Sequence, residues 1–175
     1  MHPPEPGFER HLSPISVSAR TLVRFSRFPA SEPFWSSQAR YRFDDPHPVQ
    51  AQRFGVLYVG DSLDTAFAES VIHESAFYDD GAYLIAQADL TARHLVTFTH
   101  PRRRRLQLAD LTGAALKAIG LNNDLSAGDD YRLPQQWARA IHQISRHWDG
   151  IRYVSRQHNH AHAYANTVNL ADFQV

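Results

Sequence analysis

Short apolar runs, separated by glycines, prolines and polar stretches, dominate the hydrophobic pattern of the chain. Runs of this length with turn residues at their ends are typical of buried or half-buried strands. The segments with this pattern are residues 21–27, 54–60, 83–90, 94–99, 102–111, 151–155 and 164–170. The pattern therefore predicts about seven short strands spread along the whole chain.

Helical spacing of apolar residues appears at three places between these strands. The helical segments are residues 63–71, 112–119 and 133–148. Asp61 or Ser62 can cap the first helix, while Gly120 and Gly150 end the second and third. Strands that alternate with helices, without an internal repeat, predict a single domain of the mixed α+β class.

Three stretches lack either periodicity and are predicted to be irregular. Residues 1–18 are polar and contain four prolines, so we divide the chain into a lead-in at 1–20 and a folded domain at 21–175. Residues 28–52 contain four more prolines and five aromatic side chains. A long connection this rich in aromatics is typical of a segment that covers a binding site. Residues 121–130 are predicted to form a polar loop.

Composition and charge exclude several kinds of protein. The chain has 175 residues with 18 basic and 18 acidic side chains, so no net field attracts nucleic acid or an anionic membrane. It has no cysteine, which excludes disulfides, thiol nucleophiles and zinc–thiolate sites. Neither a basic, apolar leader nor an apolar run of about 20 residues is present, so we expect a cytoplasmic protein without a membrane span.

Arg24, Glu69 and Ser155 are the candidate chemical groups, because each lies where a fold exposes side chains. Arg24 lies in the first predicted strand, Glu69 in the first turns of a helix, and Ser155 at the end of a strand. Each also has an ordinary explanation. Arg24 fits a solvent-facing strand position, Glu69 lies beside the apolar stripe of its helix, and no Gly-x-Ser-x-Gly elbow surrounds Ser155.

The histidine-rich segment near the C-terminus is a further candidate site. His158, His160 and His162 share one face if the segment is extended, and that spacing could ligate a transition metal. No carboxylate lies close in sequence to complete the ligand set, so we favour a polar strand edge or loop and expect no metal. The Arg102–Arg105 run is interpreted as a solvated turn or a contact with an acidic partner.

A set of fragments in a fixed order gives the chain a family resemblance over residue 21 to the C-terminus. The fragments are Leu22-Val-Arg-Phe25, Ala39-Arg-Tyr-Arg-Phe43, Leu57-Tyr-Val-Gly-Asp-Ser-Leu-Asp-Thr-Ala-Phe-Ala-Glu-Ser70, Asp89-Leu90, Leu108-Ala-Asp-Leu111, Asp130-Tyr131, Gln135-Gln-Trp-Ala138 and Asp149-Gly-Ile-Arg-Tyr-Val-Ser-Arg156. Together they resemble the RES domain, a family named for an arginine, a glutamate and a serine. Where that family commonly has Gly-Arg-Trp-Asn, this chain has Ala39-Arg-Tyr-Arg42.

The resemblance implies an ADP-ribosyltransferase-like α+β fold, with two small sheets flanking an NAD⁺ cleft and helices around them. It implies the toxin of a toxin–antitoxin system, silenced by a helix-turn-helix antitoxin of the Xre type. The implied activity is cleavage of NAD⁺, as substrate, at the nicotinamide–ribose bond, with ADP-ribose passed to phosphate or water. The alternative within the resemblance is a mono-ADP-ribosyltransferase that modifies a protein.

The resemblance also implies roles for individual residues. The carboxylate of Glu69 would stabilise the developing ribosyl cation, and Arg24 would hold the pyrophosphate. Tyr41 would stack on nicotinamide or close the cleft, Ser155 would hydrogen-bond the nicotinamide side or the adjacent ribose, and Tyr131 would line the pocket wall. Two other classes stay open from the residues alone: a non-catalytic module that binds an antitoxin or nucleic acid, and a histidine-based metalloenzyme.

Overall fold

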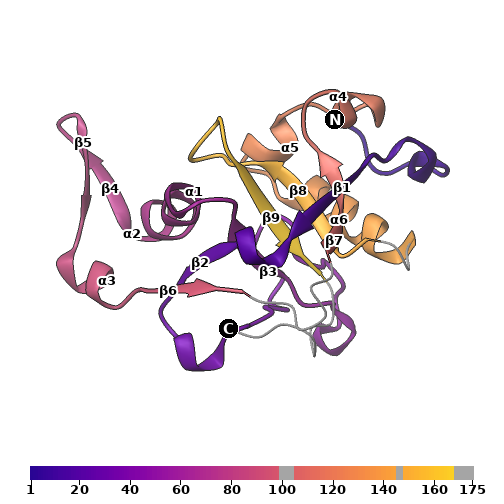
Figure 1. Ribbon diagram of the computed structural model, residues 1–175. Coiled ribbons are helices and arrows are strands. Elements are labelled where there is room, and N and C mark those ends of the chain that lie inside the picture. Colours follow the sequence, from indigo (N-terminus) through magenta and orange to yellow (C-terminus); the bar gives the residue numbers. More distant parts are fainter. Residues whose placement is uncertain (99–104, 145–147, 168–175) are drawn as a thin grey trace.

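A computed structural model of the chain describes residues 1–98, 105–144 and 148–167. Most of its strands form one seven-stranded sheet (Figure 1). In spatial order these strands are β1 (Pro14–Ser18), β7 (Arg105–Leu111), β8 (Gly150–Val154), β9 (His162–Asn166), β3 (Leu57–Gly60), β2 (Val23–Ser26) and β6 (His94–Thr97). The mixed α+β class predicted from the sequence is confirmed. The two sheets among the described residues differ greatly in size, because one has seven strands and the other has two.

One strand pair in the large sheet is parallel, β7 with β8, and the other neighbours are antiparallel. A parallel pair needs a long crossover connection, because the chain must return to the same end of the sheet. The crossover here contains α4 (Gly113–Ala118), α5 (Asp124–Ala127) and α6 (Arg132–Ile144). These helices lie beside β7 and β8 in Figure 1.

Alternate residues of the central strands pack into two separate cores, one on each face of the sheet. On β8, Ile151 and Tyr153 join the core that contains Trp137 and Ile141 of α6. The other core lies on the opposite face of the sheet. It collects Leu57 and Val59 of β3, Leu106 and Leu108 of β7, Tyr164 of β9, and Val96 with Phe98. Both faces of the central strands are therefore covered, which accounts for their nearly continuous apolar sequences.

A two-stranded sheet of β4 (Ala76–Asp79) and β5 (Ala82–Ile85) extends away from the large sheet (Figure 1). Four large side chains on it are exposed: Phe77, Tyr78, Tyr83 and Leu84. Helix α3 (Gln87–Thr91) then leads into β6. The short helical turns η1 (Phe8–His11), η2 (Ala19–Thr21), η3 (Pro29–Ser31) and η4 (Gln50–Gln52) complete the N-terminal third.

The helical segment after β3 positions residues beside the sheet edge, and it contains three pieces. These are α1 (Leu63–Phe67), the π-helical turn η5 (Ala68–Ile72) and α2 (His73–Ser75). Ser62 caps α1 through a 3.2 Å hydrogen bond that its Oγ accepts from Thr65 N. Gly60 allows a close approach, because a Cβ there would lie 2.7 Å from Ala66 N. The helix therefore packs directly against the strand that precedes it.

Most of the elements predicted from apolar spacing are confirmed, at slightly shifted ends. The structure differs from the apolar pattern at five places. Residues 14–18, placed in the irregular lead-in, form β1, because their backbone groups pair with β7. The segment 83–90 divides into β5 and α3, β4 was missed, and the loop at 121–130 contains α5. The last strand begins at His162, and the rest of its predicted range lies outside the described residues. Within the described part of the chain, no helix is long and apolar enough to cross a bilayer.

Candidate functional site

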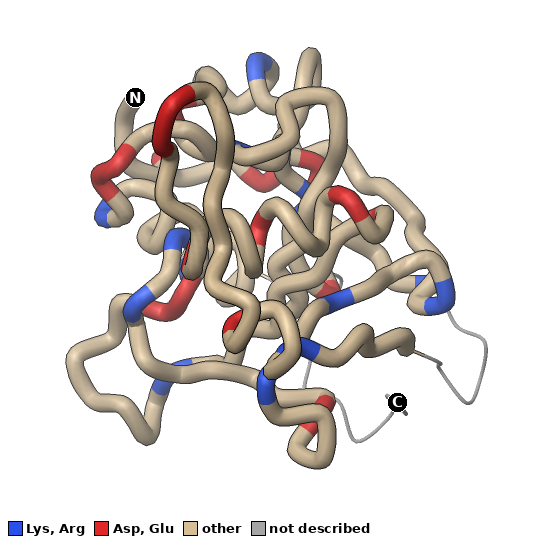
Figure 2. The backbone as a smooth tube through the Cα atoms, turned by 90° about the vertical axis from the view of Figure 1, so that its left-hand side faces the viewer, with Lys and Arg blue, Asp and Glu red and all other residues tan. Residues whose placement is uncertain are grey.

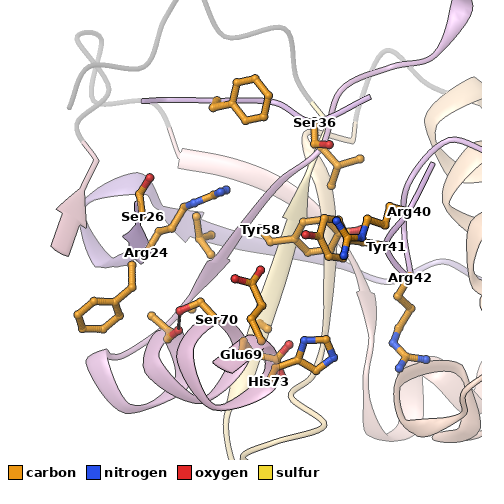
Figure 3. A pocket seen from close by; sticks show the side chains of 18 of the residues that line it. Arg24, Ser26, Ser36, Arg40, Tyr41, Arg42, Tyr58, Glu69, Ser70 and His73 are labelled. Carbon is orange, nitrogen blue, oxygen red and sulfur yellow. Dashed lines mark hydrogen bonds between the residues drawn. The ribbon is translucent and has the colours of Figure 1, made fainter. Parts of the chain in front are cut away.

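A cavity of about 510 Å³ opens where β2, β3 and the helical segment after β3 meet the aromatic connection at residues 34–42. Arg24, Tyr41, Glu69 and Tyr131 all line it. Figure 3 shows Glu69 between Arg24 on one side and the Arg40–Arg42 segment on the other, with Arg24 and Glu69 pointing into the shared space. The fold thus brings together four of the five predicted site residues.

Glu69 lies in the π-helical turn η5, a geometry that often marks functional positions in helices. Its Oε1 accepts a 2.6 Å hydrogen bond from the Ser155 hydroxyl. The same oxygen is 3.5 Å from Gln157 N. Ser155 in turn accepts a 2.9 Å bond from His158 N. The carboxylate is therefore held in one orientation by the end of β8 and the turn that follows it.

The position of Ser155 differs from the direct ligand contact that the family resemblance implied. Its side chain is 0 % exposed, and it is not among the residues that line the cavity. Its hydroxyl is fully engaged, because it donates to Glu69 and accepts from the His158 amide. Ser155 lies behind Glu69, where it can orient the carboxylate but does not face the open space.

Arg24 is held at the cavity by a buried carboxylate. Its Nε lies 3.2 Å from Glu32 Oε1, and the Glu32 side chain is only 1 % exposed. The other oxygen of Glu32 accepts a 3.0 Å bond from Phe34 N. A buried carboxylate with a cationic partner and a backbone donor is well satisfied. Glu32 thus fixes both the guanidinium of Arg24 and the backbone that carries Phe34.

Tyr41 is positioned by a turn built around Asp44, which is 0 % exposed. Asp44 Oδ2 accepts hydrogen bonds from Arg40 N and Tyr41 N, both at 2.9 Å. Asp44 Oδ1 accepts a 3.0 Å bond from the Tyr58 hydroxyl. Burial raises the pKa of the Asp44 carboxyl and raises that of Tyr58 well above its usual value. The ring of Tyr41 meets Tyr58 edge to face at 5.8 Å, which sets its place on the cavity wall.

The wall beside Tyr131 is built around Arg42. The guanidinium lies over the Tyr131 ring at 4.6 Å and donates to the carbonyl oxygens of Leu125 and Gly128 at 3.3 and 2.6 Å. Burial lowers the pKa of Arg42, and burial raises the pKa of neighbouring Tyr153 well above its usual value. Helix α5, which carries Leu125, therefore supports the arginine through its backbone.

Arginine side chains are concentrated in this cavity although the whole chain is neutral. Six arginines line it, against only two carboxylates, Glu69 and Glu74. Elsewhere basic and acidic positions are interspersed along the backbone (Figure 2). Four of the six are ion-paired: Arg24 with Glu32, Arg27 with Asp89, Arg93 with Glu74 and Arg156 with Asp129. The cavity therefore offers guanidinium donors that suit a phosphate group, without a large net positive field.

Two buried polar atoms on the cavity wall have no hydrogen-bond partner among the described residues. They are Ser126 Oγ and Arg93 Nε. Arg93 is held nearby by Glu74, whose Oε2 accepts from its Nη2 at 2.8 Å. Both atoms are buried, so they lie behind the part of the wall that a ligand in the cavity would contact.

The histidine-rich segment does not form the extended strand that would align its three histidines. A turn closes it, in which Ala161 N donates to His158 O at 2.9 Å. His162 begins β9 and its Nδ1 lies 3.6 Å from Asp61 Oδ2. In the part of the chain that the structure describes, no three His, Asp or Glu side chains are grouped to hold a metal ion. In the Arg102–Arg105 run, only Arg105 lies within the described residues.

Several cavity residues were not predicted from the sequence. Arg42, Tyr153 and Arg156 line the space, as do Arg93 and His73. Position could have indicated two of them, because Arg42 adjoins Tyr41 and Tyr153 alternates with Ser155 along one strand. Arg93 had no comparable signal, since it follows a helix that the apolar pattern did not reveal.

Comparison with known proteins identifies the family. A family model for the RES domain matches residues 19–174. The chain belongs to the RES domain family. Among solved structures, the chain is similar to one in the crystal structure of the M. tuberculosis MbcT–MbcA toxin–antitoxin complex, with a TM-score of 0.65 and 19 % identity over 97 % of this chain and 89 % of that chain. At this identity the similarity shows a shared fold. No curated protein sequence matches.

The RES domain match covers every site residue that the sequence had singled out, from Arg24 to Ser155. It begins after β1, the strand that closes the far edge of the sheet. The match therefore includes every strand of the large sheet except β1.

We predict that Asp44→Ala destabilises this RES domain by about 3 kcal/mol, because it leaves the Arg40 and Tyr41 amides and the Tyr58 hydroxyl without their acceptor. Urea denaturation measures the change in the free energy of unfolding. Asp44→Asn is the matched control. It keeps one acceptor oxygen for the two amides and should cost less than half as much. Equal stability of wild type and Asp44→Ala would contradict the role of this turn.

Proposed function

We propose that this chain is the toxin of a toxin–antitoxin system and acts by cleaving NAD⁺ at the nicotinamide–ribose bond. ADP-ribose passes to phosphate or water. The observation that carries the proposal is the Glu69 carboxylate, oriented by buried Ser155 inside a cavity rich in arginine. Membership of the RES family and the fold shared with a chain of a toxin–antitoxin complex support the same conclusion.

The bond that breaks joins ribose C1′ to the pyridinium nitrogen. Its electron pair moves to that nitrogen, so nicotinamide leaves as a neutral ring and needs no general acid. The ribose becomes oxocarbenium-like, and a nearby carboxylate stabilises this cation electrostatically. Glu69 supplies that charge. An oxygen of phosphate or water then bonds to C1′, and the acceptor loses its proton to solvent.

The rest of the cleft binds and orients the dinucleotide. Arg24 faces the cavity and can pair with the pyrophosphate through its remaining guanidinium nitrogens while Glu32 holds its Nε. Tyr41 presents an aromatic wall against which nicotinamide can stack. Tyr131 lines the cavity beside Arg42, whose guanidinium lies over its ring.

An antitoxin partner follows from the same proposal. The structural neighbour is a chain of a toxin–antitoxin complex, and RES toxins are expected to pair with a helix-turn-helix antitoxin of the Xre type. Co-expression with a small helix-turn-helix protein encoded next to this chain's reading frame tests the pairing. Recovery of one complex after affinity purification of either partner supports it, and independent elution of the two proteins contradicts it.

We predict that Glu69→Gln lowers the rate of NAD⁺ loss by about 1,000-fold, because the amide cannot compensate the positive charge of the ribosyl cation. The amide oxygen can still accept from Ser155, so the fold stays intact. The rate is measured as NAD⁺ consumption by purified protein with and without phosphate. Glu9→Gln, an exposed carboxylate outside the cleft, is the matched control.

The products of that assay separate the acceptors. ADP-ribose 1-phosphate or free ADP-ribose supports a small acceptor, whereas label from NAD⁺ on a lysate protein supports the mono-ADP-ribosyltransferase alternative. Undiminished NAD⁺ loss by Glu69→Gln would rule out the proposed role of this carboxylate.

Ser155→Ala should lower kcat about tenfold at constant KM, because Glu69 loses the hydrogen bond that orients it while the cavity wall is unchanged. Steady-state kinetics with NAD⁺ measure both constants. A rise in KM of similar size would instead show direct contact between Ser155 and the ligand.

Arg24→Lys should raise KM for NAD⁺ about tenfold, because an ammonium keeps the charge but loses the planar fork. Lysine also keeps a cation beside buried Glu32, which alanine would leave unpaired at a cost of about 3–5 kcal/mol. Initial rates over a range of NAD⁺ concentrations give KM. Unchanged KM and kcat would exclude a phosphate contact at Arg24.

A further inference from the structure

We propose that Phe28 and Phe34 form a subsite that stacks against the purine base of the dinucleotide, at the end of the cleft beyond Arg24. This inference rests on the proposed function, because it assigns a place to the half of NAD⁺ that does not react. It concerns the aromatic connection that follows β2, and none of the residues placed in the reaction above belongs to this subsite.

Both phenylalanines line the cavity and both are exposed, Phe28 by 72 % and Phe34 by 50 %. A phenylalanine in a domain of this size is normally packed in the core, as Phe43 and Phe98 are here. Two large apolar rings at the mouth of one cavity therefore indicate a partner that covers them on binding. The base of a nucleotide is such a partner, because every base has an apolar face.

The backbone that carries these rings is held in place at several points. Phe28 N donates to Ser26 Oγ at 3.0 Å, and Ser31 N donates to Phe28 O at 3.0 Å in the turn η3. Phe34 N donates to Glu32 Oε2, also at 3.0 Å. Exposure of the rings is thus a property of an ordered segment. Pre-positioned rings stack on a base without a large entropy cost.

Glu32 connects this subsite to the phosphate contact. One of its oxygens pairs with Arg24 and the other accepts from the Phe34 amide, so the guanidinium and the Phe34 backbone are neighbours. In a dinucleotide the purine base is separated from the pyrophosphate by a single ribose. A pyrophosphate held at Arg24 therefore brings the purine ring within reach of Phe34, whose backbone amide donates to the same Glu32 carboxylate.

The charges around the subsite suit an uncharged ring. Arg27, next to Phe28 in the chain, is paired with Asp89 and also donates to Ser75 Oγ. Arg93, which donates to the same hydroxyl, is paired with Glu74. These two arginines are compensated, so little net field remains at this end of the cleft. The stacking surface then decides the affinity there.

The test compares NAD⁺ with nicotinamide mononucleotide, which has the reacting half of NAD⁺ but no purine. In the Phe28→Ala/Phe34→Ala variant, we expect KM for NAD⁺ to rise at least tenfold at unchanged kcat, since base–aromatic stacking contributes about one to two decades of affinity per base. The kinetics with nicotinamide mononucleotide should not change. Phe28→Tyr/Phe34→Tyr should restore the wild-type KM for NAD⁺.

Phe77→Ala is the matched control, because Phe77 is also exposed, by 61 %, but lies on β4 and does not line the cavity. It should leave both substrates unaffected. Equal effects of the double alanine variant on both substrates, or no effect on either, would overturn the subsite.

A failure of the proposed function gives a different result, in which wild type consumes neither substrate. The subsite is then tested alone by calorimetry, with ADP-ribose and ribose 5-phosphate as probes. Weaker binding of ADP-ribose by the double alanine variant, at unchanged binding of ribose 5-phosphate, supports the purine contact. Unchanged binding of ADP-ribose, or an equal loss for both probes, overturns it.

Discussion

The hydrogen bond from Ser155 to Glu69 is the interaction on which the rest of the site depends. Its two residues are 86 positions apart, and they meet because β9 lies between β8 and β3 in the sheet. The end of β8 then faces the helical segment that follows β3. A free glutamate on a helix surface samples several rotamers, whereas a buried hydroxyl at 2.6 Å selects one. The strand order of the sheet therefore fixes the orientation of the Glu69 carboxylate.

Buried carboxylates organise the remainder of the cleft in a similar way. Glu32 holds Arg24, and Asp44 holds the turn that carries Tyr41. Each accepts at least one backbone amide, so it stabilises a loop conformation as well as a side chain. This arrangement reconciles a neutral chain with an arginine-lined cavity, because acidic partners lie behind the wall and arginines face the space. The arrangement resembles a preorganised anion site, in which the protein fixes the charges before the ligand arrives.

Apolar spacing predicted the elements with a strong local signal and missed those without one. The helix that starts after Ser62 and the strands β3 and β8 follow from a cap, glycine boundaries and continuous apolar runs. Strand β1 had no such signal, since its pairing with β7 is a contact between distant segments. The hairpin of β4 and β5 exposes its aromatics, so it shows no buried face. Helix α5 is only four residues long, which is too short for a periodic pattern.

The sequence by itself determined the family, the mixed class and the residue types that the chemistry needs. The order of short fragments and the residue types within them were enough to name four candidates: Arg24, Tyr41, Glu69 and Tyr131. Their roles stay predictions. Only the tertiary structure decided that Ser155 lies behind Glu69 and that Phe28 and Phe34 stand open at the cavity. The physical reason is that burial and hydrogen-bond partners arise from contacts between distant segments. A serine at a strand end looks the same in sequence whether its hydroxyl faces a ligand or a carboxylate.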